Sequence, residues 1–264
     1  MNALLIDAGN SRLKWASLRG RRLGPLHSAA WDSGKLPGVA ARVAAKAGRP
    51  QIVLVSCVAG ARVQRALRGA LRAQRLPAPV FVTSRRQQAG VRNAYRWPGQ
   101  LGVDRWLSLL AARAIYPADA VCIVSVGTAL TVDLLDGRGR HAGGIIVPGP
   151  ALMVESLLSS TAEIRRRAER RGRAVRGSAA RSFFARDTGS AIHAGSLHAA
   201  AAITAYAMSR ARETVGVPPR LLLTGGGARE LQRLLASRRL GLRVHHVDNL
   251  VLRGLAVLAE QESG

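Results

Sequence analysis

A strand–turn–strand unit with a small polar turn occurs twice in this chain, and this repetition limits the fold more than any other feature. The first unit covers residues 4–18 and turns at 8–11, and the second covers residues 120–136 and turns at 127–129. Glycine and asparagine tolerate the positive φ angles of tight turns, so each unit predicts a β-hairpin. Alternating strand and helix patterns follow each hairpin. We therefore expect an α/β protein with two related lobes and a cleft between them.

The lobes are expected to divide close to Pro117. Residues 1–117 would hold the first hairpin, and residues 118–264 would hold the second. A chain of 264 residues is long for one hydrophobic core and sufficient for two. A final helix is expected over residues 249–260, and it could pack back on the first lobe.

The turn of the first hairpin carries residue types that can hold phosphate groups. Asp7 ends an apolar strand, Gly9 allows close approach of the backbone, and Asn10 and Ser11 supply short donors. The exposed amides of such a turn can bind phosphate oxygens, and Asp7 could hold Mg²⁺ on them, directly or through water. A plain β-turn with capping residues is the alternative, because no helix follows as it does in a P-loop.

The turn of the second hairpin offers Gly127, the hydroxyl of Thr128 and exposed amides. An ordinary hairpin turn would look the same, but the repetition of the pattern in both lobes favours phosphate binding. Asp133 follows this turn and could face Mg²⁺, although a solvated strand-end acid is the simpler interpretation. The glycines 225–227 after a strand could support a nucleotide base or merely link the strand to a helix.

A third motif, Pro-Gly-Gln-Leu-Gly-Val-Asp-Arg at residues 98–105, ends a polar loop and begins a helix. Asp104 would lie in the first helical turn, where acids are common because the helix N-terminus favours negative charge. A carboxylate there could also take the proton of an alcohol that attacks phosphorus. Arg105 beside it could hold the anionic end of a carboxylate substrate.

Together these motifs resemble those of type III pantothenate kinases, which belong to the actin-like (ribonuclease H-like) ATPase and sugar kinase superfamily. The matching segments, in order along the chain, are 7–11, 101–105, 127–129, 143–149, 187–188 and 247–255. The resemblance covers essentially the whole chain, and the motifs at 102–105 and 143–149 are its most specific part. It implies two actin-like lobes with a nucleotide cleft. It also implies ATP-dependent phosphorylation of pantothenate to 4'-phosphopantothenate, the first step of coenzyme A synthesis.

The resemblance implies a role for each matching residue. Asp104 would be the catalytic proton acceptor. The residues that bind ATP, with its Mg²⁺, would be Asp7, Ala8, Gly9, Asn10, Ser11, Arg12, Leu13, Lys14 and Thr128. The residues that bind pantothenate would be Tyr95, Gly102, Val103, Asp104, Arg105 and Thr188. Thr188 would reach the substrate of the other subunit, so the resemblance implies a homodimer. Alternatively, Tyr95 is an ordinary loop aromatic, and Asp187 or Thr188 is only a helix cap.

One position departs from the family pattern. Members commonly have an acid two residues before the second-loop glycine, and it binds a monovalent cation, K⁺ or NH₄⁺. This chain has Ser125 there. Serine carries no charge and is a weaker oxygen ligand, which puts such a cation site in doubt, although backbone carbonyls could still bind one.

The charge of the chain suggests a different class of function. The formal net charge is +25, which is typical of proteins that bind nucleic acid. The arginines are spread along the chain, however, and the one dense run, 165–181, is either a solvated basic face or a polyanion-binding patch. A non-catalytic accessory or regulatory protein with a kinase fold and a basic nucleic-acid-binding face is therefore the alternative. The presence of Asp7, Asp104 and Arg105 argues against it, so we do not expect a nucleic-acid partner.

The remaining features indicate a cytoplasmic protein. Cys57 and Cys122 lie in apolar strand patterns without metal-binding spacing, which predicts buried reduced thiols. No apolar run approaches the roughly 18 residues of a membrane span, so we expect no membrane partner. The chain begins with an apolar strand pattern rather than a basic signal segment.

Overall fold

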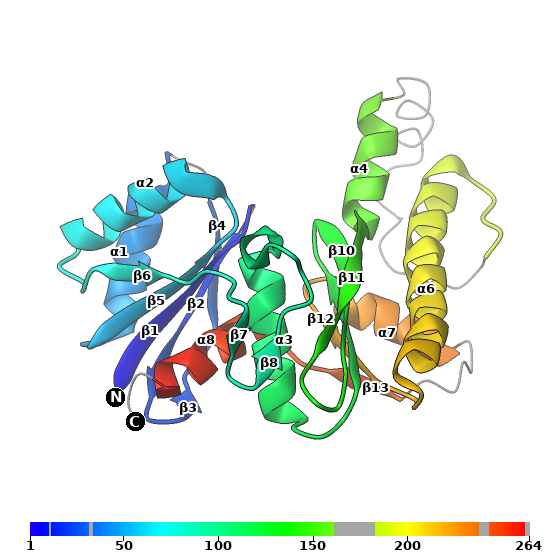
Figure 1. Cartoon of the computed structure of the whole chain (residues 1–264). Helices are drawn as coiled ribbons and strands as arrows, with labels where there is room; N and C mark the ends of the chain where they lie inside the picture. Colours follow the sequence, from blue (N-terminus) through cyan, green and yellow to red (C-terminus); the bar gives the residue numbers. More distant parts are fainter. Residues whose placement is uncertain (11, 32–33, 161–182, 238–242, 262–264) are drawn as a thin grey trace. The chain divides into compact units, whose positions relative to one another are not determined.

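The computed structural model describes residues 1–10, 12–31, 34–160, 183–237 and 243–261 (Figure 1). The chain forms two compact units. The first unit consists of residues 1–117, 139–141 and 249–264, and the second consists of residues 118–138 and 142–248. The arginine-rich run 165–181 lies outside the described residues.

The first unit is built on a six-stranded sheet. Its strand order is β3-β2-β1-β5-β6, with β4 also paired to β2. The strands are β1 (Asn2–Ala8), β2 (Arg12–Arg19), β3 (Arg22–Leu23), β4 (His27–Ala30), β5 (Ile52–Cys57) and β6 (Pro79–Phe81). β1 and β2 form the predicted antiparallel hairpin, and β5 runs parallel to β1 on its other side.

Helices cover both faces of this sheet (Figure 1). Leu4, Ile6 and Ala8 share one core with α1 (Leu36–Ala47) and α2 (Gly60–Ala73). Because side chains alternate along a strand, the odd-numbered residues of β1 face the opposite side. On that side, α8 (Leu250–Gln261) packs on β1 and β5, and α3 (Val103–Ile115) packs on β5 and on α8. Asp7 is therefore on the face that carries α3 and α8.

The loop before α3 is more ordered than a plain polar connection. It contains a two-stranded hairpin, β7 (Gln87–Gln88) and β8 (Val91–Arg92), and a 3-10 turn, η1 (Pro98–Gln100). The sequence indicates only a polar loop over residues 84–100, and the structure adds these short elements to it. The strands are only two residues long, which is too short for a pattern of alternating polarity to reveal them.

A close contact between two helices fixes α3. Gly254 in α8 lies directly against the carbonyl oxygen of Leu107 in α3, and a Cβ atom at residue 254 would overlap that oxygen. The obstacle is backbone rather than a flexible side chain, so the helices would have to separate. Since α3 also carries Asp104 and Arg105, this contact positions the third motif.

Gly254→Ala is therefore expected to destabilise the protein by about 3 kcal/mol, measured by urea unfolding, because the added methyl overpacks a backbone contact. Gly69→Ala in α2 is the matched control. Gly69 is exposed and has no atom within 4 Å of a built Cβ, so its substitution should be neutral or stabilising by up to about 1 kcal/mol. Equal stability of the two variants would contradict the packing argument.

The second unit is built on a five-stranded sheet of order β11-β10-β9-β12-β13. The strands are β9 (Val121–Val126), β10 (Ala129–Leu135), β11 (His141–Pro148), β12 (Arg220–Thr224) and β13 (Val244–His246). β9 and β10 form the second predicted hairpin, and β12 runs parallel to β9. The second sheet thus repeats the topology of the first. In each sheet, the first strand of an antiparallel hairpin pairs on its other side with a parallel strand, and a second parallel strand follows at the edge.

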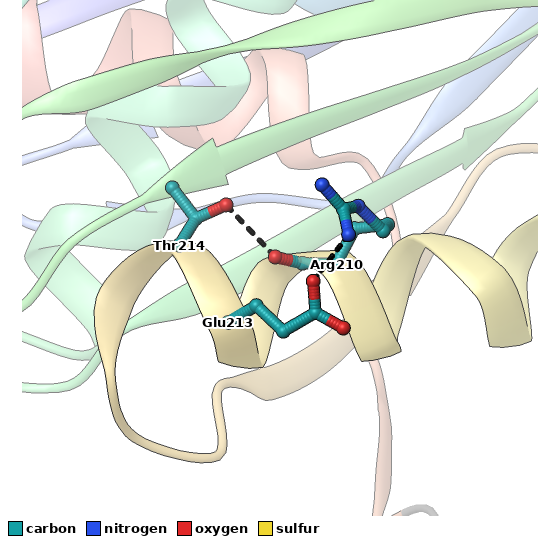
Figure 2. Close-up of polar contacts among 3 residues, drawn as sticks. All are labelled: Arg210, Glu213 and Thr214. Atoms are coloured by element: carbon teal, nitrogen blue, oxygen red, sulfur yellow. Dashed lines mark hydrogen bonds and ion pairs between the residues drawn. The ribbon is translucent and has the colours of Figure 1, made fainter.

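Three helices belong to the second unit among the described residues: α4 (Pro150–Ser160), α6 (Thr188–Val215) and α7 (Ala228–Ser237). α6 and α7 share a core with Cys122, Val124 and Val126 of β9. α6 ends at Gly216 in the left-handed conformation. Figure 2 shows its last turns, where Arg210 pairs with Glu213 and the Thr214 hydroxyl donates to the Arg210 carbonyl at 2.8 Å. These exposed contacts contribute little stability.

The structure settles two smaller expectations about buried groups. Cys57 and Cys122 are buried and free, as predicted, and burial raises the pKa of Cys122 to about 12, so this thiol stays protonated. Asp133 is not the solvated strand-end acid that the sequence suggests, because it lies within β10 and is only 3% exposed.

Among the described residues, no helix is long and apolar enough to cross a membrane.

Candidate active site

Three polar residues lie side by side on adjacent strands of the first unit. In the register of the sheet, Asp7 is directly opposite Lys14 on β2 and Ser56 on β5. Directly paired residues point to the same face of a sheet. Asp7, Lys14 and Ser56 therefore form a polar row on the face that carries α3 and α8, next to the turn of the first hairpin.

The environment of Asp7 disfavours its ionised form. Burial raises its pKa to about 6, and repulsion from Asp104 adds to the rise, whereas Lys14 and Ser56 lower it. The negative charges of Asp7 and Asp104 are thus close enough to repel. Two such carboxylates suit a site that receives a cation, and Mg²⁺ typically takes one or two carboxylates together with phosphate oxygens.

The carboxylate of Asp104 is folded back over the start of α3. Its Oδ1 accepts a hydrogen bond from the Arg105 amide at 2.9 Å. The same oxygen would lie 2.7 Å from a Cβ atom at Gly102, the N-cap residue of the helix. Gly102 therefore leaves the space that the Asp104 carboxylate occupies, which explains why the motif has glycine at this position.

Gly102→Ala is expected to lower kcat by about tenfold to a hundredfold with little change in folding stability, because the new methyl pushes the Asp104 carboxylate out of place. Gly99→Ala is the matched control in the same segment, since a Cβ atom there meets nothing within 4 Å. Steady-state kinetics on both variants, with thermal unfolding as a check, tests this. Equal activity of the two variants would show that Gly102 does not position Asp104.

The Arg105 side chain is buried against the ring of Tyr95. It is 5% exposed, its guanidinium lies over the Tyr95 ring at 5.7 Å, and its Nη1 donates to the Tyr95 hydroxyl at 3.0 Å. Tyr95 in turn stacks on His141, with ring centroids 6.0 Å apart. Tyr95 is thus tied to the third motif rather than being an isolated loop aromatic.

The loop that carries Tyr95 is held by several hydrogen bonds between side chains and backbone groups. The buried Asn93 side chain accepts from the Tyr95 amide at 3.0 Å and donates to the carbonyl of Arg85 at 3.2 Å. The guanidinium of Arg86 donates to the carbonyls of Tyr95 and Arg96. The Ser84 hydroxyl donates to the carbonyl of Leu101 at 2.7 Å. These bonds preorganise the segment from residue 84 to the start of α3.

Ser28 of β4 and Trp31, which follows β4, support the turn of the first hairpin through hydrogen bonds. The Gly9 amide donates to the Arg12 carbonyl at 3.1 Å, which closes the turn. The Trp31 indole donates to the Gly9 carbonyl at 3.0 Å, and the Arg12 guanidinium donates to the Ser28 hydroxyl. Ala8 and Leu13 are buried core residues, so only their backbone can face a ligand. Ser11 lies outside the described residues.

The turn of the second hairpin is closed by a hydrogen bond from the Gly127 amide to the Ala129 carbonyl at 3.0 Å. Thr128 is exposed at its tip. Gly149, the last residue of the 143–149 motif, lies against the carbonyls of Gly127 and Thr128, and its amide donates to Thr128 at 2.8 Å. The Gly227 amide, which follows β12, donates to the Val126 carbonyl at 3.0 Å. Gly149 and Gly227 therefore both hold the backbone of this loop in place.

Ser125 is one of three hydroxyl residues in a row. It is directly opposite Thr131 on β10 and Thr224 on β12, so the three side chains share a face of the second sheet. Hydroxyls are neutral oxygen ligands, so this row can supply oxygen atoms to a cation but no negative charge. Among the described residues, no three His, Cys, Asp or Glu side chains group as a metal site.

Thr188 begins α6 but does not cap it. The Asp187 carboxylate accepts from the Ser190 amide at 2.9 Å and is the N-cap. Thr188 instead lines an open, mostly apolar pocket of about 1140 Å³ with residues of α4 and α6.

The first unit thus gathers Asp7, Lys14 and Asp104 on one face of its sheet, and joins Tyr95 to Arg105. Ser125, Thr128 and Thr188 belong to the second unit. Sequence reasoning missed Ser56, Trp31 and His141. Ser56 could have been found from the register of two adjacent strands, but Trp31 and His141 come from distant segments, and nothing local in the sequence marks them.

Solved structures of other proteins share this fold. An activator of 2-hydroxyisocaproyl-CoA dehydratase from Clostridium difficile, with bound ADPNP, matches with a TM-score of 0.53 and 15% identity over 100% of this chain and 96% of that one. MreB 5 of Spiroplasma citri bound to AMPPNP also matches with a TM-score of 0.53, at 10% identity over 99% and 97% of the two chains. The fold is therefore that of the actin-like ATPases and sugar kinases, with one actin-like sheet in each unit, and this confirms the predicted fold class.

Sequence relatives define the family within that class. The model of the type III pantothenate kinase family matches residues 3–210. Type III pantothenate kinases from Nitrosococcus oceani and Aromatoleum aromaticum are each 38% identical over 98% of this chain, and over 94% and 98% of their own lengths. The chain belongs to the type III pantothenate kinase family, which confirms the predicted resemblance. It is accordingly a kinase that transfers a phosphoryl group to an alcohol.

Proposed function

We infer that this chain phosphorylates pantothenate with ATP, the first step of coenzyme A synthesis. The observation that carries this inference is the start of α3, where Gly102 makes room for the Asp104 carboxylate and Arg105 lies bonded to Tyr95. This motif stands in a chain that matches the family over most of its length. The alternative of a non-catalytic nucleic-acid-binding protein is not favoured.

Asp104 is the proposed proton acceptor of the reaction. The pantothenate hydroxyl attacks the γ-phosphorus of ATP, the new O–P bond forms as the bond to the β-phosphate oxygen breaks, and the hydroxyl proton passes to Asp104. The hydrogen bond from the Arg105 amide to Oδ1 fixes the carboxylate in advance, and this supports the role.

The two hairpin turns are the proposed phosphate-binding loops. In the first unit, the loop residues 7–14 offer backbone amides and the Lys14 ammonium. In the second unit, Thr128 offers an exposed hydroxyl. Asp7 fits a Mg²⁺ ion carried by ATP, since its raised pKa reflects a partly buried carboxylate whose desolvation outweighs the attraction of Lys14. Such an ion would neutralise charge on the phosphates.

The boundary at residue 117 is then proposed to separate the lobe of the first phosphate loop and the substrate motif from the lobe of the second loop. Residues 139–141 and 249–264 belong to the first of these units. Pantothenate is proposed to lie against Tyr95, Gly102, Val103 and Arg105, with its carboxylate bound by arginine. We also propose a cytoplasmic location, which accords with this substrate pair.

A homodimer is also proposed, with Thr188 acting in the partner's site. Its support is an apolar surface in the second unit: no residue of α4 is buried, and Leu152, Met153 and Leu157 line the open pocket next to Thr188. A soluble monomer rarely leaves such a surface uncovered. Because Asp187 caps α6, the Thr188 hydroxyl is not needed for the helix.

The first experiment is ADP release by the purified protein with Mg-ATP, with and without pantothenate, in Na⁺ buffer and again with K⁺ or NH₄⁺. We expect release that depends on pantothenate. No such release in any of these salts would exclude pantothenate as the acceptor.

The same assay tests the monovalent cation. The neutral hydroxyl row at Ser125 predicts a weak response to K⁺, whereas Ser125→Asp should strengthen it because a carboxylate adds a charged ligand. Thr131→Ser, which keeps a neutral hydroxyl in the same row, is the control. A strong K⁺ response of the unaltered protein would contradict this prediction.

A further inference from the structure

A tryptophan outside the first hairpin holds the backbone of its turn. Trp31 follows β4, and its indole N–H donates to the Gly9 carbonyl at 3.0 Å. The two residues are 22 positions apart in the chain, and the contact between them is partly buried. A hydrogen bond shielded from water is stronger than one on an open surface. The turn is therefore fixed by tertiary structure as well as by its own residues.

Trp31 reaches this carbonyl from one particular side of the sheet. Its ring packs against the hydrophobic core that β1 and β2 share with α1 and α2. Asp7 and Lys14 are on the opposite face, because side chains alternate along a strand. The Gly9 carbonyl is therefore directed towards the side of α1 and α2, away from the polar row.

The direction of this carbonyl sets the direction of the next amide. A trans peptide is planar, and its C=O and N–H groups point in opposite directions. Among the described residues, no peptide bond is cis. The Asn10 N–H is therefore directed away from Trp31, towards the face of the polar row. Asn10 is exposed, and within the part of the chain that the structure describes its N–H donates to no backbone carbonyl, so it can donate to a ligand.

A second contact from β4 fixes positive charge on that same face. Arg12 and Lys14 are two residues apart on β2, so their side chains share a face. The Arg12 guanidinium donates to the Ser28 hydroxyl from Nε at 3.1 Å and from Nη2 at 2.8 Å. Ser28 is directly opposite Lys14 in the register of β2 and β4. A guanidinium and an ammonium group therefore lie on the side to which the Asn10 amide points, which suits a phosphate group.

We propose that Trp31 is a positioning residue for nucleotide binding. Its indole holds the peptide between Gly9 and Asn10 so that the Asn10 N–H donates to a phosphate oxygen of ATP. This inference rests on the proposed first phosphate loop, and it adds a residue from outside that loop and one particular backbone donor. Holding the amide in advance reduces the cost of ordering an exposed turn when the nucleotide binds.

Trp31→Phe tests the proposal, because phenylalanine keeps an aromatic ring against the core but has no N–H donor. Trp15→Phe is the matched control. Trp15 belongs to the same core, and among the described residues its indole N–H has no hydrogen-bond partner. The control therefore removes the same group without removing a hydrogen bond.

Calorimetric titration with Mg²⁺ and a non-hydrolysable ATP analogue measures nucleotide binding, and steady-state kinetics give the two KM values. We expect Trp31→Phe to raise the Kd of the analogue and the KM for ATP by about threefold to tenfold, which corresponds to the loss of one hydrogen bond. The KM for pantothenate should stay the same, because the substrate motif is not touched. Trp15→Phe should leave the Kd and both KM values unchanged.

Nitrogen-15 NMR of the unaltered protein tests the backbone donor directly, and it does so even if Trp31→Phe does not fold. Addition of the analogue should shift the Asn10 amide proton downfield and slow its exchange with water. In Trp31→Phe the shift should be smaller. An Asn10 signal that does not respond to the analogue would overturn the proposal.

The remaining outcomes separate this inference from the proposed function. An unchanged Kd in Trp31→Phe would overturn the role of Trp31, and an equal rise in both variants would also do so, because it would reflect core packing. If the unaltered protein does not bind the analogue, the phosphate loop and this inference both fail. The expected changes in a protein that releases no ADP with pantothenate would contradict pantothenate as the acceptor and support the role of Trp31.

Discussion

Asp104→Asn is expected to lower turnover by about a hundredfold or more while leaving ATP binding intact. The substitution keeps the shape of the side chain and its place over Gly102, but removes the group that accepts the hydroxyl proton. Steady-state ADP release measures the loss, and titration with a nucleotide measures ATP binding. Because Asp104 repels Asp7, nucleotide binding should be unchanged or slightly tighter.

Two comparisons keep this prediction specific. Asp104→Glu retains a carboxylate and should recover part of the activity, which a purely structural role of Asp104 would not produce. Thermal unfolding of both variants should show a folded protein. Full activity of Asp104→Asn would remove Asp104 from the mechanism.

Asp7→Asn is expected to stabilise the unliganded protein at neutral pH and to remove most of its activity. In the folded state the pKa of Asp7 is about 6, against an ordinary value of 3.8. Ionised Asp7 therefore costs stability, by at most about 3 kcal/mol and by less where solvent reaches the carboxyl. The neutral amide avoids this cost, but it cannot carry the charge that a phosphate-bound cation requires.

The direction of the pKa shift of Asp7 determines how the stability change of Asp7→Asn depends on pH. Below the unfolded pKa, Asp7 is protonated in both states and costs nothing. The cost develops as pH rises from about 4 to 6 and is complete above that, so the advantage of Asp7→Asn should grow over this window and then remain constant.

Urea unfolding at several pH values tests this, with Glu230→Gln on the exposed surface of α7 as the control. A stability difference that does not change with pH would contradict the electrostatic explanation. Mg-ATP should stabilise the unaltered protein more than Asp7→Asn.

Several features of this protein could be predicted from local sequence patterns. Both hairpins form where the polar turns at 8–11 and 127–129 predict them, because turn chemistry and strand hydrophobicity are properties of neighbouring residues. Asp104 and Arg105 lie in the first turn of a helix, as the 98–105 motif predicts. The family itself could be recognised from the motifs and their order.

Other features follow only from the pairing of distant segments. The row of Asp7, Lys14 and Ser56 depends on the register of three strands, and a shift of one residue would turn every side chain to the other face. The burial of Asp133 and the contact of Gly254 with Leu107 depend on what packs against them. Neither has a local signature.

The sequence by itself determined the two hairpins, the helix that begins at the third motif and the family, since each depends on short-range order along the chain. Only the tertiary structure decided the raised pKa of Asp7, the contact of Gly149 with the second loop and the stacking of His141 on Tyr95. The physical reason is that burial, electrostatic repulsion and close packing depend on distance in space, and the residues concerned are far apart in the chain.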